Sequence, residues 1–206
     1  MSSNISVLLA DDHYLITDIL SAFLEAESNI SVDAAHTLEE AKEKLRAGKH
    51  DIALIDYRMP GVTDTSFVGE LAKESPNTKI LVFSGAIPDW LAMQIVEAGA
   101  SGYIPKSMSA QSIVNIICLV KSGQSFIPAS LMQFANKKQR SVESLSTLEY
   151  QITKMIATGA VNKEIARELN LSDTTVKMHV RSIFSKLDVR NRTEAAIKAR
   201  HFGIPE

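Results

Sequence analysis

The sequence lacks the features that stabilise or anchor a chain by means other than a packed core. It has one cysteine, Cys118, among 206 residues, so no disulfide framework and no Cys-rich metal site can form. Cys118 stands in the apolar run Ile116–Val120, where we expect it to be a small buried side chain. The chain also has no low-complexity tract and no repeat of fixed period.

Long hydrophobic runs are missing as well. No apolar run approaches the roughly 20 residues that a membrane-spanning helix needs. The first residues, Met1 to Asn4, provide neither the basic stretch nor the apolar core of a signal peptide. We therefore expect a cytoplasmic protein.

The charged residues are distributed unevenly along the chain. The net charge is −2, but residues 1–125 carry 16 acidic and 9 basic side chains, whereas residues 126–206 carry 8 acidic and 13 basic ones. A chain of 206 residues is long enough for two domains. The asymmetry indicates two domains with different partners, the second partner being a polyanion.

Short apolar segments alternate with segments of helical periodicity over the first 120 residues. Strands are expected at Ile5–Ala10, Ile30–Ala35, Asp51–Tyr57, Lys79–Phe83 and Gly102–Ile104. Helices are expected at 14–26, 38–47, 67–73, 90–98 and 113–120. Strict alternation of this kind predicts an α/β domain with a doubly wound, five-stranded parallel sheet. For this sheet we expect the flavodoxin-like strand order.

Polar residues stand at the carboxyl ends of four of these strands. Asp11 and Asp12 follow the first strand, Asp56 ends the third, Ser84 ends the fourth and Lys106 follows the fifth. These ends meet at the edge where open α/β sheets bind ligands. Three carboxylates there would repel one another, and an all-oxygen set with few protein ligands favours Mg²⁺. A hydroxyl and an ammonium complete a site that can hold a phosphoryl group.

Each of these residues, taken alone, has a more ordinary interpretation. Asp11 and Asp12 could cap the following helix, and Asp56 could be a helix cap or a solvated loop charge. Ser84 could be a turn residue, and Lys106 a surface charge. The joint pattern favours the binding site, because each group lies at the end of a different strand.

The alternation ends at residue 122. We interpret residues 1–121 as the first domain, 122–143 as an interdomain linker and 144–206 as an all-α second domain. Within the linker, a short helix is expected over 128–135, and the polar stretch Asn136–Ser144 follows it. Helices are then expected at 146–157, 162–169 and 173–187, with a last one after Asn191.

The helix expected over 173–187 has two different faces. Its apolar stripe consists of Val176, Val180, Ile183 and Leu187. The opposite face carries Thr174, Lys177, Met178 and Arg181. Ser172 is a favourable N-cap for it. Two short helices across a tight connection, the second with a basic and polar face, are typical of a helix-turn-helix. A helical bundle with a solvated face is the alternative.

The segments LLADDH, LIDYRMPG, FSGA and GYIPKS make residues 5–122 similar to the receiver domain of two-component response regulators. The resemblance implies that Asp56 accepts a phosphoryl group from a phosphohistidine on a sensor histidine kinase. It further implies a Mg²⁺ site in which Asp12 binds the ion directly and Asp11 binds mostly through water. Asp56 and the Arg58 carbonyl would complete this site.

The same resemblance assigns the residues that respond to phosphorylation. Ser84 and Lys106 would bind the phosphoryl oxygens, and Tyr103 would turn inward. Gly85 is small, as access to the acceptor requires. One stretch, Val62–Thr65, departs from the family pattern, which usually has an Asp-Gly pair two residues after Gly61. This departure concerns the shape of the loop and the reaction rates.

The segment NKEIARELNLSDTTVKMHVRSIFSKL makes residues 143–204 similar to the LuxR-type helix-turn-helix. Together, the two domains are identified as a member of the NarL/FixJ class of response regulators. The resemblance implies that Thr174, Lys177, Met178 and Arg181 lie at the DNA interface, where Arg181 could read guanine and Met178 could contact a thymine methyl. Candidate phosphate contacts are Asn162, Lys163, Lys186 and Arg192.

Three further features of the second domain concern its packing and its first helix. His179 is interpreted as a packing residue. The helix after Asn191 would pair two DNA-binding domains by family analogy, although core packing explains its alanines equally well. Near the start of the domain, Glu149 is retained but the arginines usual in the family are missing.

The sequence therefore predicts a DNA-binding transcription regulator, dimeric when active, that Mg²⁺-dependent phosphorylation of Asp56 switches. It would not be an enzyme beyond the phosphorylation and dephosphorylation of its own Asp56. One alternative is a phosphorylation-independent DNA-binding dimer whose first domain is an interaction module. A phosphohydrolase is a third hypothesis, but such enzymes have a second aspartate where Arg58 stands.

Overall fold

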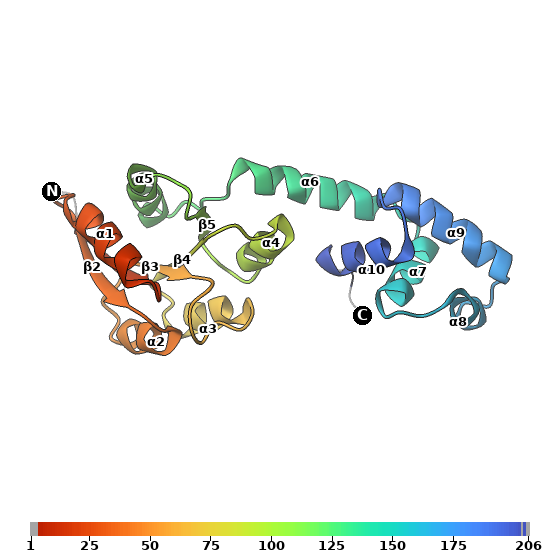
Figure 1. The fold of residues 1–206 in the computed structure, drawn as a ribbon, viewed down its shortest axis with the longest axis horizontal. Helices are drawn as coiled ribbons and strands as arrows, with labels where there is room; N and C mark the ends of the chain where they lie inside the picture. The colour runs from red at the N-terminus through yellow and green to blue at the C-terminus, as the bar shows by residue number, and fades with distance from the viewer. Residues whose placement is uncertain (1–3, 203, 205–206) are drawn as a thin grey trace. The chain divides into compact units, whose positions relative to one another are not determined.

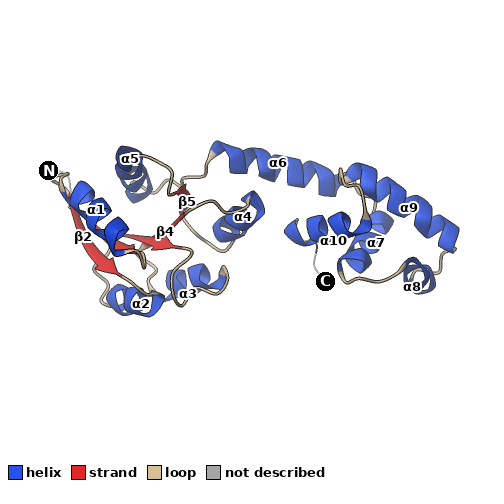
Figure 2. Cartoon of the chain, viewed as in Figure 1, coloured by secondary structure: helices blue, strands red, loops and turns tan. Residues whose placement is uncertain are grey.

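The computed structural model describes residues 4–202 and 204, with the backbone alone for residues 137 and 140. The chain divides into two compact units, residues 1–131 and 132–206. The first unit contains the sheet and the second is helical (Figure 2).

The sheet unit alternates strands and helices in chain order. Its strands are β1 (Ile5–Ala10), β2 (Ile30–Ala35), β3 (Ile52–Asp56), β4 (Lys79–Ser84) and β5 (Gly102–Pro105). Its helices are α1 (Tyr14–Glu25), α2 (Leu38–Arg46), α3 (Ser66–Glu74), α4 (Asp89–Glu97) and α5 (Ala110–Lys121). The strands pair in parallel in the order β2-β1-β3-β4-β5. The predicted doubly wound sheet of flavodoxin-like order is confirmed.

Two layers of helices cover this sheet. Strand geometry sends alternate side chains to opposite faces. On β1, Val7 and Leu9 pack with α1 and α5, whereas Leu8 and Ala10 pack with α2, α3 and α4 (Figure 1). All of β3 is buried, because helices lie on both of its sides. Polar side chains at the carboxyl ends of these strands are therefore held on a rigid frame.

Cys118 is exposed, so the prediction of a buried thiol is wrong. The buried side chains of α5 in the core of this unit are Ile113, Val114, Ile116, Ile117 and Val120. Their spacing follows the helical period and leaves position 118 on the outer face. A continuous apolar run did not distinguish the two faces of this helix.

The chain returns to the sheet after α5 and pairs with the outer edge of β5. Phe126 N–H donates to the Ser101 carbonyl at 3.0 Å, and Tyr103 N–H donates to the Phe126 carbonyl at 3.2 Å. Gly102 makes this approach possible, because a Cβ at this position would lie 2.5 Å from the Phe126 carbonyl oxygen. A few residues later, Leu131 is buried in the same hydrophobic cluster as Tyr103.

The helix expected over 128–135 is longer than predicted. In the structure, α6 runs without a break over Ala129–Glu143 and includes most of the polar stretch. This stretch contains neither proline nor glycine, so nothing in it interrupts a helix. Gln139 donates to Glu143 one turn further on, at 2.8 Å, while Phe134 and Val142 pack against the core of the helical unit.

The helical unit continues with four more helices. These are α7 (Thr147–Ala157), α8 (Asn162–Glu168), α9 (Asp173–Lys186) and α10 (Arg192–His201). Ser172 caps α9, as predicted, and accepts from Thr175 N–H at 3.1 Å. The predicted apolar stripe of α9 lies in the core together with Ala195 and Ala199 of α10. Over the described residues, no helix has the length and apolar character to cross a membrane.

A buried carboxylate connects two helices of this unit. Glu149 on α7 is 4% exposed and completes a capping box with Ser146. Its carboxylate also accepts from the Ser182 hydroxyl and pairs with the Lys186 ammonium of α9, both at 2.6 Å. Burial alone would raise the pKa of Glu149, but the bonds from Lys186, Ser182 and Ser146 lower it to about 2.

Gly102→Ala is expected to destabilise the sheet unit, whereas Gly69→Ala is not. The new methyl group at 102 would displace Phe126, at a cost of about 1–3 kcal/mol. Gly69 is inside α3, where a Cβ would meet only an ordinary contact at 3.6 Å, and alanine there should add about 0.5–1 kcal/mol. Urea unfolding followed by circular dichroism measures the free energy of unfolding of each variant, which should fall for Gly102→Ala and rise for Gly69→Ala. Equal stability of the two variants would contradict this packing.

Glu149→Gln is expected to destabilise the helical unit at pH 7 but not at pH 2. A carboxyl group with a folded pKa of about 2 and an ordinary unfolded pKa stabilises the fold above about pH 5, by about 3 kcal/mol. This contribution is lost as the pH falls from about 5 towards 2. Unfolding curves of both proteins across this range should therefore converge at low pH. A constant difference would show that the carboxylate charge is not responsible.

Candidate functional site

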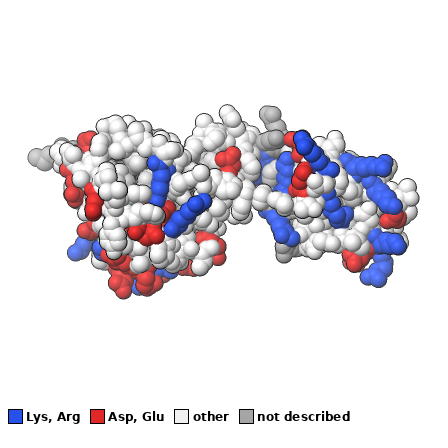
Figure 3. Space-filling model, in the orientation of Figure 1, with Lys and Arg blue, Asp and Glu red and all other residues white. Residues whose placement is uncertain are grey.

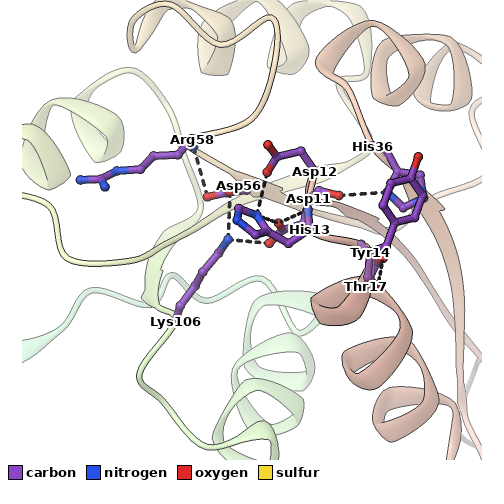
Figure 4. Close-up of polar contacts among 9 residues, drawn as sticks. All are labelled: Asp11, Asp12, His13, Tyr14, Thr17, His36, Asp56, Arg58 and Lys106. Carbon is purple, nitrogen blue, oxygen red and sulfur yellow. Dashed lines mark hydrogen bonds and ion pairs between the residues drawn. The ribbon is translucent and has the colours of Figure 1, made fainter.

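The carboxyl ends of β1, β3 and β5 bring two carboxylates and an ammonium into contact. Asp11 is fully buried and Asp56 is 1% exposed. The Lys106 ammonium lies 2.6 Å from an Asp11 oxygen and 2.9 Å from an Asp56 oxygen (Figure 4). Burial alone would lower the pKa of Lys106, but these two carboxylates raise it above its usual value. Lys106 therefore stays charged and compensates the buried acids.

Asp12 and His13 complete the acidic cluster. The His13 ring nitrogen Nδ1 lies 2.8 Å from Asp12 Oδ1 and 3.1 Å from Asp11 Oδ1. The hydrogen bond to Asp11, followed by the charge of Asp12, raises the pKa of His13. Ligand atoms of Asp11, Asp12, His13 and Asp56 all lie within 4.8 Å of one another. This spacing is compatible with one cation between them.

Ser84 lies at the end of β4, where its hydroxyl is buried and has no hydrogen-bond partner among the residues that the structure describes. A buried polar group without a partner costs free energy, so this hydroxyl is available to a ligand that reaches the sheet edge. The backbone connects it to the neighbouring strand, because Lys106 N–H donates to the Ser84 carbonyl at 2.7 Å. A phosphoryl group on Asp56 would provide acceptor oxygens for both residues.

Tyr103 on β5 already lies inward in this structure. The residue is 5% exposed, and its hydroxyl donates to the Gly85 carbonyl at 3.1 Å. Burial, and then the charge of Asp89, raise the pKa of Tyr103. The ring is thus held beside the loop that follows Ser84.

The loop after β3 has a defined shape despite its departure from the family pattern. Arg58 N–H donates to Asp56 Oδ1, and the Arg58 guanidinium donates to the Ala86 carbonyl, both at 3.1 Å. Gly61 adopts a φ of +95°, which favours glycine. Asp64 accepts from Ser66 N–H at 2.7 Å and closes the turn into α3. A hydrogen-bonded Asx turn thus stands in the stretch where the usual Asp-Gly pair is missing.

Three residues near this cluster were not predicted as part of it. His13 directly follows two candidate ligands, so its position in the sequence could have indicated it. His36 follows β2, the one strand whose carboxyl end contributes none of the predicted site residues. Its Nδ1 lies 3.0 Å from the Asp11 carbonyl oxygen, and Tyr14 stacks on its ring.

The second candidate site is the outer face of α9. Val176, Val180 and Ile183 are buried, and the side chains on the opposite face are in water, including Met178 at 60% exposure. The four residues predicted for this face, Thr174, Lys177, Met178 and Arg181, are all exposed. His179 is half-buried, as a packing role requires. On the face drawn in Figure 3, Lys and Arg side chains gather over the helical unit.

The four candidate phosphate contacts have different surroundings. Lys163 is exposed at the start of α8. Lys186 pairs with the buried Glu149. Arg192 donates to Asn162 at 2.9 Å and to the Ala160 carbonyl, so it connects α10 with the start of α8. Three of the four therefore already have a partner within the unit.

Two family models match the chain, one in each unit. The family model of the response regulator receiver domain matches residues 7–118. The model of the luxR family of bacterial regulatory proteins matches residues 143–199.

Curated relatives match along nearly the whole chain. The transcriptional regulatory protein LnrK of Bacillus subtilis is 32% identical over 97% of this chain and 98% of its own length. Transcriptional regulatory protein LiaR of the same organism is 33% identical over 95% of this chain and 96% of its own length. The response regulator protein VraR of Staphylococcus aureus is 32% identical over 95% of this chain and 96% of its own length.

Solved structures share the architecture. The RcsB response regulator of Salmonella typhimurium superposes with a TM-score of 0.77 at 21% identity, over 96% of this chain and all of that one. The response regulator ChrA, from a heme-sensing two-component system, gives a TM-score of 0.54 at 26% identity. The match covers 98% of this chain and 99% of the ChrA chain. The chain therefore belongs to the response regulators of the NarL/FixJ class, transcription regulators in which a receiver domain is followed by a LuxR-type DNA-binding domain.

Proposed function

We propose that Asp56 is the residue through which phosphorylation controls this regulator. The observation that carries the proposal is the contact of its buried carboxylate with Lys106, beside the unpartnered Ser84 hydroxyl. An Asp56 oxygen would attack the phosphorus of a phosphohistidine on a sensor histidine kinase. The new O–P bond forms as the P–N bond breaks, and the histidine nitrogen leaves with the electron pair and takes up a proton. The protein catalyses nothing beyond the phosphorylation and hydrolysis of this aspartate.

Mg²⁺ is the metal that the site residues fit. Asp11, Asp12 and Asp56 supply carboxylate oxygens close enough to share one ion, which suits a hard cation that keeps several waters. The Arg58 carbonyl would add a further oxygen. When bound, the ion offsets the negative charge that accumulates as the phosphoryl group approaches.

Phosphorylation of Asp56 would be transmitted to the rest of the receiver by three residues, Ser84, Lys106 and Tyr103. The phosphoryl group adds negative charge and acceptor oxygens, which the Ser84 hydroxyl and the Lys106 ammonium would bind. Tyr103 contacts the backbone of Gly85, directly after Ser84. A shift of Ser84 would therefore move the carbonyl that now holds the Tyr103 hydroxyl.

The output of the regulator is DNA binding by the exposed face of α9. We propose that residues 1–121 are the receiver and 144–206 the DNA-binding domain, and that the active form is a homodimer on two related half-sites. Lys177, Met178 and Arg181 would face base edges, with Thr174 beside them. Support for a DNA partner comes from RcsB, whose structure has been solved as a DNA complex and superposes with a TM-score of 0.68. Phosphate contacts would come from Asn162, Lys163, Lys186 and Arg192.

Asp56→Asn is expected to abolish phosphorylation. The protein is incubated with acetyl phosphate and Mg²⁺, and phosphate incorporation is measured by mass spectrometry of the intact chain. The amide cannot attack phosphorus, so the variant should incorporate none. Asp64→Asn is the matched control, because Asp64 is an exposed carboxylate of the following loop and should leave incorporation unchanged. Equal incorporation in Asp56→Asn and wild type would refute the assignment.

Arg181→Ala and Lys163→Ala are expected to weaken DNA binding in different ways. On a fragment selected by the wild-type protein, loss of a base contact at 181 should cost about 1–3 kcal/mol and relax sequence preference. Loss of a phosphate contact at 163 should weaken all sequences alike and reduce the salt slope by about one. Lys154→Ala, on α7, is the control. Fluorescence anisotropy across salt concentrations measures both effects, and wild-type affinity for Arg181→Ala would exclude this face of α9.

A further inference from the structure

The imidazole of His36 contacts the start of the loop that carries Asp11, Asp12 and His13, and also the first residue of the helix that follows this loop. This loop, residues 11–13, connects β1 with α1. At its start, the Asp11 carbonyl oxygen lies 3.0 Å from His36 Nδ1. Directly after it, the Tyr14 ring stacks on the His36 ring with 4.0 Å between centroids and an angle of 32° between planes. Figure 4 shows His36 and Tyr14 side by side at the edge of the cluster.

The hydrogen bond from His36 Nδ1 to the Asp11 carbonyl takes the place of a backbone hydrogen bond that β2 does not provide. The pairing of β1 with β2 extends to Asp11, whose N–H donates to the Ala35 carbonyl at 3.0 Å. In a parallel ladder, the Asp11 carbonyl would next accept from the backbone N–H of residue 37. The strand has ended by then, because Thr37 is the N-cap of α2 and accepts from Glu40 N–H at 3.2 Å. The His36 ring provides the donor instead.

The partners fix which atom of His36 carries a proton. A carbonyl oxygen only accepts, so Nδ1 must be the N–H donor. The backbone of His36 is held separately, because its own N–H donates to the Glu40 carboxylate at 2.8 Å. The ring is half-buried, whereas Tyr14 is 64% exposed. An aromatic side chain this exposed contributes little to the core, so its clearest contact is the stack on His36.

We infer that His36 is a positioning residue for the metal site: its ring fixes the Asp11 carbonyl and the start of α1, and thereby the direction of the Asp11 and Asp12 carboxylates. This inference rests on the proposed Mg²⁺ site. Ligand direction decides metal affinity, because Mg²⁺ tolerates little departure from octahedral geometry. Groups that orient metal ligands commonly change affinity by about 10- to 100-fold when removed. Since the His36 ring holds the backbone of a ligand rather than its carboxylate, we expect the low end of this range.

The test compares two substitutions that separate the donor from the ring. His36→Phe keeps an aromatic ring against Tyr14 but has no donor. His36→Asn loses the ring, but its side-chain N–H occupies nearly the position of Nδ1. His50→Asn is the control, because His50 is a second histidine next to a strand of this sheet and bonds Asp33 at 2.8 Å, outside the acidic cluster. Isothermal titration of the full-length proteins with MgCl₂ gives the dissociation constants, and acetyl phosphate provides the phosphorylation rate at each Mg²⁺ concentration.

His36→Phe should raise the Mg²⁺ dissociation constant about tenfold, and His36→Asn should recover most of this loss. The half-saturating Mg²⁺ for phosphorylation should shift in parallel, while the rate at saturating Mg²⁺ changes little. A merely structural role would instead lower the unfolding temperature of both His36 variants without metal and leave the dissociation constant of the folded protein unchanged. His50→Asn should bind Mg²⁺ as wild type does.

A dissociation constant for His36→Phe within about twofold of wild type would overturn the inference, as would equal losses in His36→Phe and His36→Asn. If the wild-type protein itself binds no Mg²⁺, the proposed metal site fails, which is a different result. Should His36→Phe not fold, Tyr14→Leu at its exposed position provides the test. Removing the stack should raise the dissociation constant by about two- to threefold, and an unchanged value would overturn the inference.

Discussion

Asp11 and Asp56 are excluded from water, and the Lys106 ammonium between them makes this burial tolerable. An unpaired buried charge costs several kcal/mol, and removing the partner of a buried ion pair is strongly destabilising. The three side chains come from the ends of β1, β3 and β5, so their contact requires the strand order that the structure has. The arrangement is also responsive, because a phosphoryl group or a cation changes the charge that Lys106 has to balance.

Much of the fold and of this site could be predicted because parallel sheets impose a simple geometry. Buried strands are continuous apolar runs, and the polar residue that ends each run must lie at one edge. Asp56 after Ile52–Ile55 and Lys106 after Gly102–Pro105 follow this rule directly. The positions of α6 and Cys118 were harder to predict, since each depended on a property that hydrophobic pattern does not report. One was the absence of helix-breaking residues, and the other was the face of α5 that packs against the sheet.

The contacts that orient the site were the part least accessible from sequence. His36 acts through a backbone carbonyl, and its partner is defined only once the pairing of β1 with β2 is known. Glu149 is a similar case in the helical unit. The sequence shows that a glutamate stands at position 149, but its bonds to Ser182 and Lys186 depend on how α7 packs against α9. Such residues accept or donate across elements far apart in the chain, where spacing carries no information.

The pairing of Phe126 with β5 has a consequence for the molecule's association with others. β5 is the last strand of the sheet, and an outer strand with free N–H and C=O groups invites pairing with foreign chains. Here the protein's own backbone at Phe126 pairs with part of the edge of β5, and the absence of a side chain at Gly102 lets it do so. The segment that leads towards the DNA-binding domain thus also protects the β5 edge of the receiver against uncontrolled strand-to-strand aggregation.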